Sequence, residues 1–182
     1  MRRLAYCFVL PALFLLAGCT TAPETPEAKQ ELTSDAQQAV VDMEAIDPGL
    51  TGFVDRAYAY AAFPTVGKGA LGVGGAYGKG EVFRHGNRIG YADITQISGG
   101  PQIGAEAFSE LIVFENEATF NRFLNNTFEV NASLTAVAVH AESSSSTRYT
   151  DGVAVFTHPK GGLAAEVALN GQKFTYRAAN PQ

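Results

Sequence analysis

The glycine-rich stretch between residues 67 and 80 contains a spacing of glycines that is found in phosphate-binding loops of other proteins. Gly67 to Gly72 fits the GxGxxG pattern, in which a glycine loop opens a helix whose N-terminus holds a dinucleotide. The residues that follow, Val73 to Lys79, are rich in glycine and would form a poor helix. We therefore predict that these glycines serve bends and close strand contacts, and that the protein binds no nucleotide.

Side chains that could catalyse a reaction are scattered along the chain. His85, His140 and His158 do not lie at metal-ligand spacing from one another or from an acid. Glu106 and Glu110 would face the same side of one strand and could form an acid–base pair. Polar residues alternating on a solvated sheet face explain this pair more simply. The sequence therefore predicts a protein that is not an enzyme and that uses no metal or other cofactor.

Charge is distributed unevenly. The formal net charge of −5 argues against nucleic-acid binding, which needs a basic surface. From residue 24 to residue 55 there are eight acids and one base. From residue 68 to residue 88 the balance reverses, with the bases Lys68, Lys79, Arg84 and Arg88 against one acid, Glu81. These four bases could contact anionic lipid headgroups. Alternatively, they are ordinary charges on the edge of a solvated hairpin.

The N-terminus has the features of a bacterial lipoprotein signal. Arg2 and Arg3 precede an apolar run that is too short to span a bilayer. The run ends in Leu16-Ala17-Gly18-Cys19, which resembles the lipobox. We predict that residues 1–18 are removed and that Cys19 carries diacylglycerol and fatty acyl chains such as palmitate. Thr20 replaces the aspartate that favours inner-membrane retention. We therefore expect a lipid anchor in the bacterial cell envelope, at the outer membrane facing the periplasm.

The rest of the chain has the composition of one globular domain, with 46% hydrophobic and 17% charged residues. Residues 19–33 contain Pro23 and Pro26 without hydrophobic periodicity, which predicts a lipidated, disordered tether. Residues 34–182 are expected to form a single domain. The capping box of Ser34 and Gln37 predicts a helix to Ile46. Asp47-Pro48 predicts the start of a second helix, which extends to Ala57.

From Tyr58 onward the pattern becomes that of β-structure. The expected strands are Tyr60–Phe63, Leu71–Tyr77, Lys79–Arg84, Ile89–Ile97, Ile103–Phe114, Leu134–Val139, Val153–Phe156, Leu163–Leu169 and Lys173–Tyr176. His85-Gly86-Asn87 and Asn170-Gly171 predict hairpin turns, and Ser143 to Ser146 a polar loop. Asn116 should cap one short inserted helix. The predicted fold class is α+β, with two N-terminal helices and a twisted, mainly antiparallel sheet that is open or barrel-like.

Several short motifs together resemble the signature of the SYLF domain. They include Tyr60 to Gly75 with Tyr77-Gly78-Lys79-Gly80, then Gly90-Tyr91, Gln102 to Ala105, Gly161-Gly162-Leu163 and Asn170-Gly171. The motifs keep the family's order over roughly residues 50 to 177. The resemblance implies a non-enzymatic lipid-binding module. Lys68 matches the family's lysine after the Phe-Pro motif, whereas Lys79, Arg84 and Arg88 are candidates on local charge alone.

Two functions remain open at this point. The first is an envelope lipoprotein whose SYLF-like domain binds membrane phospholipids or other envelope lipids through anionic headgroups. The second is a structural or protein-interaction lipoprotein whose only lipid contact is the acylated Cys19. The sequence identifies no protein partner for either function.

Overall fold

The computed structural model describes residues 22–130, 136–140, 142–160 and 171–179. Within these ranges the fold is α+β, as predicted: one mainly antiparallel sheet with helices, two of them N-terminal. The sheet formed by the described strands is open and does not close into a barrel. Cys19 and the predicted strand Leu163–Leu169 lie outside the described residues.

The N-terminal helix is longer than predicted. The helices are α1 (Pro26–Ile46), the 3-10 turn η1 (Pro48–Leu50), α2 (Thr51–Arg56), α3 (Glu117–Leu124) and α4 (Ser143–Ser146). Helix α1 begins at Pro26 because Thr25 caps it, accepting a hydrogen bond from the Ala28 N–H at 3.2 Å. The predicted start at Ser34 was therefore wrong, and residues 26–33 are helical instead of tether. No helix in the described ranges is long and apolar enough to cross a membrane.

The strands are fewer and longer than predicted. They are β1 (Ala59–Arg84), β2 (Asn87–Phe114), β3 (Glu129–Val130), β4 (Ala136–Ala138), β5 (Val153–Lys160) and β6 (Gln172–Ala178). Three predicted strands merge into β1 and two into β2. Pro64 does not end β1, because a register shift between Phe63 and Val66 accommodates it within the ladder. The predicted turn at His85-Gly86 and the helix capped by Asn116 are both confirmed.

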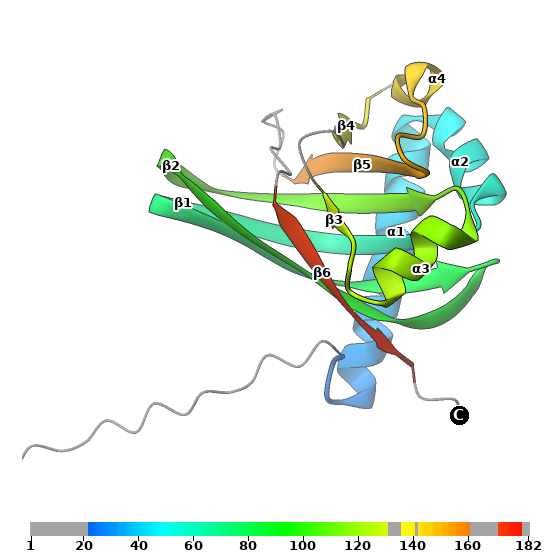
Figure 1. Cartoon of the computed structure of the whole chain (residues 1–182), viewed down its shortest axis with the longest axis horizontal. Helices are drawn as coiled ribbons and strands as arrows, with labels where there is room; N and C mark the ends of the chain where they lie inside the picture. Colours follow the sequence, from blue (N-terminus) through cyan, green and yellow to red (C-terminus); the bar gives the residue numbers. More distant parts are fainter. Residues whose placement is uncertain (1–21, 131–135, 141, 161–170, 180–182) are drawn as a thin grey trace, which may run out of the picture.

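Strands β1 and β2 form one long hairpin that folds back on itself near its midpoint (Figure 1). A straight strand of 26 residues would be about 85 Å long, and Val66 and Gly78 would lie about 40 Å apart. Instead, a Cβ atom at Gly78 would lie 2.8 Å from Val66 Cγ2. The ladder between β1 and β2 continues on both sides of the fold, with a register shift between Leu71 and Val73. One hairpin thus supplies two layers of sheet.

The remaining strands extend these two layers. The second half of β2 pairs with β5 through Ala107 to Phe114, and β4 lies parallel beyond β5. The first half of β2 pairs with β6 through Gly90 to Gln96, and β3 lies beyond β6. Both β1 and β2 run through the two layers, and β2 pairs with the added strand in each layer.

Residues of β2 alternate between two hydrophobic cores. Phe108, Ile112 and Phe114 belong to the core between the layers, which α3 completes at one end. Leu111 and Val113 belong to a second core beneath α1, η1 and α2. The apolar run that begins at Leu111 is explained by this burial of both faces, as expected for a central strand.

The close approach of the two halves of β1 predicts a specific sensitivity to glycine substitution. A Cβ atom at Gly80 would lie 2.5 Å from both Ala62 O and Phe63 Cδ1, whereas one at Gly69 would meet nothing within 4 Å. We expect Gly80→Ala to lower the free energy of unfolding by about 2–3 kcal/mol, because the layers must separate to admit the methyl group. Gly69→Ala should change it by less than about 0.5 kcal/mol. Chemical denaturation of the two variants checks this, and equal losses would contradict the packing described.

Candidate functional site

The four predicted basic residues do not form one patch. Lys68 lies near the point where β1 folds back, directly opposite Glu106 in the ladder, and Lys79 lies opposite Asp93. Arg84 and Arg88 flank the turn at the far end of the hairpin (Figure 1). The structure brings Arg84 and Arg88 near each other and separates them from Lys68 along the length of the sheet.

Arg88 is held within the fold by a buried acid. Its Nη1 atom lies 3.0 Å from Oε1 of Glu81, which is fully buried, and also donates to the Tyr91 hydroxyl at 2.9 Å. Thr33 of α1 donates to the same Glu81 oxygen at 2.7 Å. Burial lowers the pKa of Arg88, but its hydrogen bond and charge attraction to Glu81 outweigh that effect and raise the pKa. Arg88 thereby joins α1 to the hairpin.

This contact predicts that Arg88 and Arg84 have different effects on stability. Arg88→Gln should lower the free energy of unfolding by about 2 kcal/mol, because it leaves the Glu81 carboxylate buried without its cation. Arg84→Gln removes the same charge from the exposed side of the same turn and should cost less than about 0.5 kcal/mol. Denaturation by urea measures both values. A loss as large in Arg84→Gln as in Arg88→Gln would mean that net charge, and not the contact with Glu81, is responsible.

The segments of β1 and β2 at which the hairpin folds back contain no charged residue. We define the hairpin bend as residues 69–78 of β1 and 94–105 of β2, which contain no acidic, basic or histidine residue. The two cross-strand pairs of opposite charge, Lys68 with Glu106 and Lys79 with Asp93, border it on both sides.

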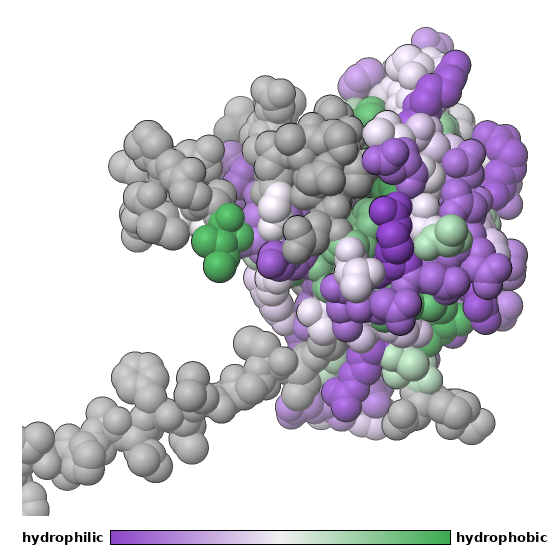
Figure 2. All heavy atoms as spheres, in the orientation of Figure 1, coloured by the Kyte–Doolittle hydropathy of each residue, from purple (hydrophilic) through white to green (hydrophobic). Residues whose placement is uncertain are grey.

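The hairpin bend also exposes hydrophobic side chains. Ile97 is 84% exposed and Tyr77 is 39% exposed, whereas Ile94, in the same strand, is fully buried. Figure 2 shows a strongly hydrophobic residue projecting at this end of the molecule. Ile97 and Tyr77 are therefore the apolar side chains that the bend offers to a partner.

Glu110 lies in the interior, which corrects the prediction of a solvated sheet face. Its side chain is on the inner side of β2 with Phe108 and Ile112, and it accepts a hydrogen bond from Nε2 of Gln172 in the opposite layer at 3.0 Å. Burial raises the pKa of the Glu110 carboxyl from 4.5 to about 8, and the bond from Gln172 offsets this only in part. Glu106, by contrast, is exposed. The two carboxyl groups therefore do not share an environment suited to acid–base catalysis.

The raised pKa of Glu110 predicts how stability depends on pH. Since the folded state holds a proton that the unfolded state releases, stability should fall as pH rises from about 4.5 to about 8. The slope contributed approaches about 1.4 kcal/mol per pH unit. Glu110→Gln should remove this contribution and raise the melting temperature at pH 8. The exposed Glu106→Gln is the matched control, and thermal unfolding from pH 5 to pH 8 is the measurement. Parallel pH profiles for wild type and Glu110→Gln would contradict the assignment.

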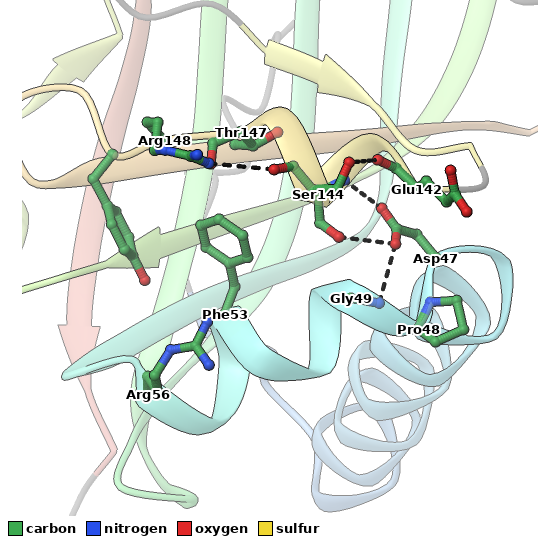
Figure 3. A pocket seen from close by; sticks show the side chains of 11 residues that line it. Asp47, Pro48, Gly49, Phe53, Arg56, Glu142, Ser144, Thr147 and Arg148 are labelled. Atoms are coloured by element: carbon green, nitrogen blue, oxygen red, sulfur yellow. Dashed lines mark hydrogen bonds between the residues drawn. The ribbon is translucent and has the colours of Figure 1, made fainter.

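A pocket of about 730 Å³ lies between η1, α2 and α4 (Figure 3). Asp47 lines this pocket and joins η1 to α4. Its carboxylate accepts hydrogen bonds from the Ser143 hydroxyl at 2.7 Å, the Ser144 hydroxyl at 2.8 Å and the Gly49 N–H at 3.1 Å. The Ser144 N–H also donates to it. Burial raises the pKa of Asp47, but these four hydrogen bonds together lower it below its ordinary value.

The sequence alone does not indicate this pocket. Asp47 was predicted only as a helix cap, which it is, and residues 143 to 146 were predicted as a polar loop. They form instead the short helix α4, in which Ser143 and Ser144 are buried. No local signal links Asp47 to these serines, because the contact joins segments that are distant in the sequence.

The fold and these sites define an open α+β sheet protein with a folded-back hairpin, an uncharged bend and a pocket beside its N-terminal helices. No family model matches the sequence. The chain is 24% identical over 149 residues to the beta cell expansion factor A of Aeromonas veronii, a distant homologue. The match covers 81% of this chain and 57% of the relative, so the chain spans little more than half of that protein's length.

Proposed function

We propose that the protein is an envelope lipoprotein whose SYLF-like domain binds lipid without catalysing a reaction. In this proposal Cys19 carries the acyl anchor, and the domain faces the periplasm from the outer membrane. The observation that supports it best is the uncharged hairpin bend with its exposed Ile97.

The side chains of the hairpin bend and its borders would match the layers of a membrane interface, from acyl chains to headgroups. Ile97 would enter the acyl region, where burying its side chain contributes about 1.5–3 kcal/mol. Tyr77, with an apolar ring and a polar hydroxyl, suits the boundary between chains and headgroups. Lys68 and Lys79 border the bend at the level where anionic headgroups would lie. Arg84 and Arg88, at the other end of the hairpin, would take no part in this contact.

A single inserted isoleucine gives weak binding, and the lipid anchor would supply the rest of the affinity for the membrane. An acyl chain on Cys19 keeps the domain near the bilayer, so that the local lipid concentration is high and a weak contact is populated. The acidic face of the N-terminal region opposes a flat approach of α1 to an anionic surface, which favours contact through the bend.

Liposome flotation of the mature chain with Cys19→Ser tests the proposal. The wild-type surface should bind vesicles, more strongly when they contain anionic phosphatidylglycerol and less strongly at physiological salt. Ile97→Ser should weaken binding about tenfold or more. Val41→Ser is the matched control, since Val41 is 54% exposed on α1, outside the bend.

Two outcomes would contradict this proposal. Equal binding by the Ile97→Ser and Val41→Ser variants would show that the bend is not the contact. If the parent chain bound no vesicle even at millimolar lipid, where a weak contact is detected, the alternative would be favoured: a structural or protein-interaction lipoprotein whose only lipid contact is the acylated Cys19.

A further inference from the structure

The pocket beside α2 and α4 is separate from the hairpin bend, and none of its lining residues belongs to the bend. It contains two arginines, Arg56 at the end of α2 and Arg148 just after α4. Neither guanidinium group forms an ion pair within the part of the chain that the structure describes. Two cations in one pocket without acidic partners are an arrangement that favours an anionic ligand.

Arg148 is held by hydrogen bonds to the backbone, and Arg56 lies over a glycine. Arg148 donates from Nη1 to the carbonyl oxygens of Thr147 at 2.9 Å and Ser145 at 3.3 Å, which leaves its other N–H groups for a ligand. The guanidinium of Arg56 lies over Gly52, with Nη1 and Nη2 3.1 Å from where a Cβ atom would be. A larger residue at position 52 would displace it.

The acids of the pocket do not neutralise these cations. The Asp47 carboxylate is saturated by its four hydrogen bonds to Ser143, Ser144 and Gly49. In Figure 3 Asp47 and Glu142 lie on the side of the pocket away from Arg56 and Arg148. The pocket therefore has a basic side and an acidic side.

The basic side is also aromatic. The rings of Phe53 and Tyr149 are 5.3 Å apart, and Figure 3 shows the Phe53 ring between Arg148 and Arg56. Phe53 is anchored from behind by Phe156 at 5.2 Å. A ligand bound to the two guanidinium groups would thus place its remaining atoms against these rings.

We propose that this pocket binds an organic anion whose carboxylate or phosphate contacts Arg56 and Arg148 and whose apolar body packs on Phe53 and Tyr149. A guanidinium group offers paired N–H donors that match either anion. The pocket volume of about 730 Å³ is within the range of small-molecule sites. This site goes beyond the proposed membrane contact and does not depend on it.

Isothermal titration calorimetry of the mature chain with Cys19→Ser tests the proposal with octyl phosphate, octanoate and octanol. At least one of the two anions should bind more tightly than octanol, and the tighter anion identifies the headgroup chemistry. Arg56→Gln with Arg148→Gln should weaken that anion at least tenfold and leave octanol unchanged. Arg122→Gln with Arg177→Gln removes the same charge from exposed positions elsewhere and is the matched control.

Further variants separate the site from folding and from the membrane contact. Arg56→Gln alone alters an exposed side chain and should itself weaken the anion several-fold if the double variant unfolds. Ile97→Ser should bind the anion normally, so a failure of vesicle binding would leave this result unaffected. The proposal is overturned if neither anion binds more tightly than octanol. It is also overturned if the Arg56 and Arg148 variants bind as the control does.

Discussion

The close packing of β1 against itself is the constraint on which the rest of this structure depends. Gly78 and Gly80 let the second half of the strand lie against Thr65, Phe63 and Ala62 of the first half, at distances that no side chain would allow. Because the ladder with β2 continues through the fold, both strands turn together and one hairpin becomes two layers. The core between the layers and the place of the bend at one end of the hairpin both follow from this geometry.

The same geometry distributes the polar groups among distinct roles. At the turn end, buried Glu81 forms an ion pair with Arg88 and accepts a hydrogen bond from Thr33, which joins α1 to the hairpin. Between the layers, Glu110 and Gln172 connect the two halves of the sheet by a hydrogen bond. Lys68 and Lys79 border the bend. Charges that the sequence places in one basic stretch are therefore separated by the fold into structural and surface positions.

The sequence predicts the types of element well and their extents poorly. Asn116 and His85-Gly86 are local signals, and the helix and the turn that they predict are present. Pro64 was interpreted as a strand end, whereas a register shift between Phe63 and Val66 absorbs it. The prediction that the glycines allow close strand contacts is confirmed at Gly78 and Gly80. Whether Glu110 faces water depends on a second layer of sheet, and alternation within one strand carries no information about that layer.

The folded-back hairpin has a consequence for the order in which the chain acquires its structure. Pairs near the turn, such as Arg84 with Asn87, join residues that are close in sequence, whereas Ala59 with Phe114 closes the longest loop of the ladder. Zippering from the turn therefore costs little loop entropy at first, and the two halves of β1 meet only after pairing has passed the fold. Strands β5 and β6 then add to β2, which is already paired with β1 along its other edge. The hairpin is, in this sense, the template on which the C-terminal third of the chain is assembled.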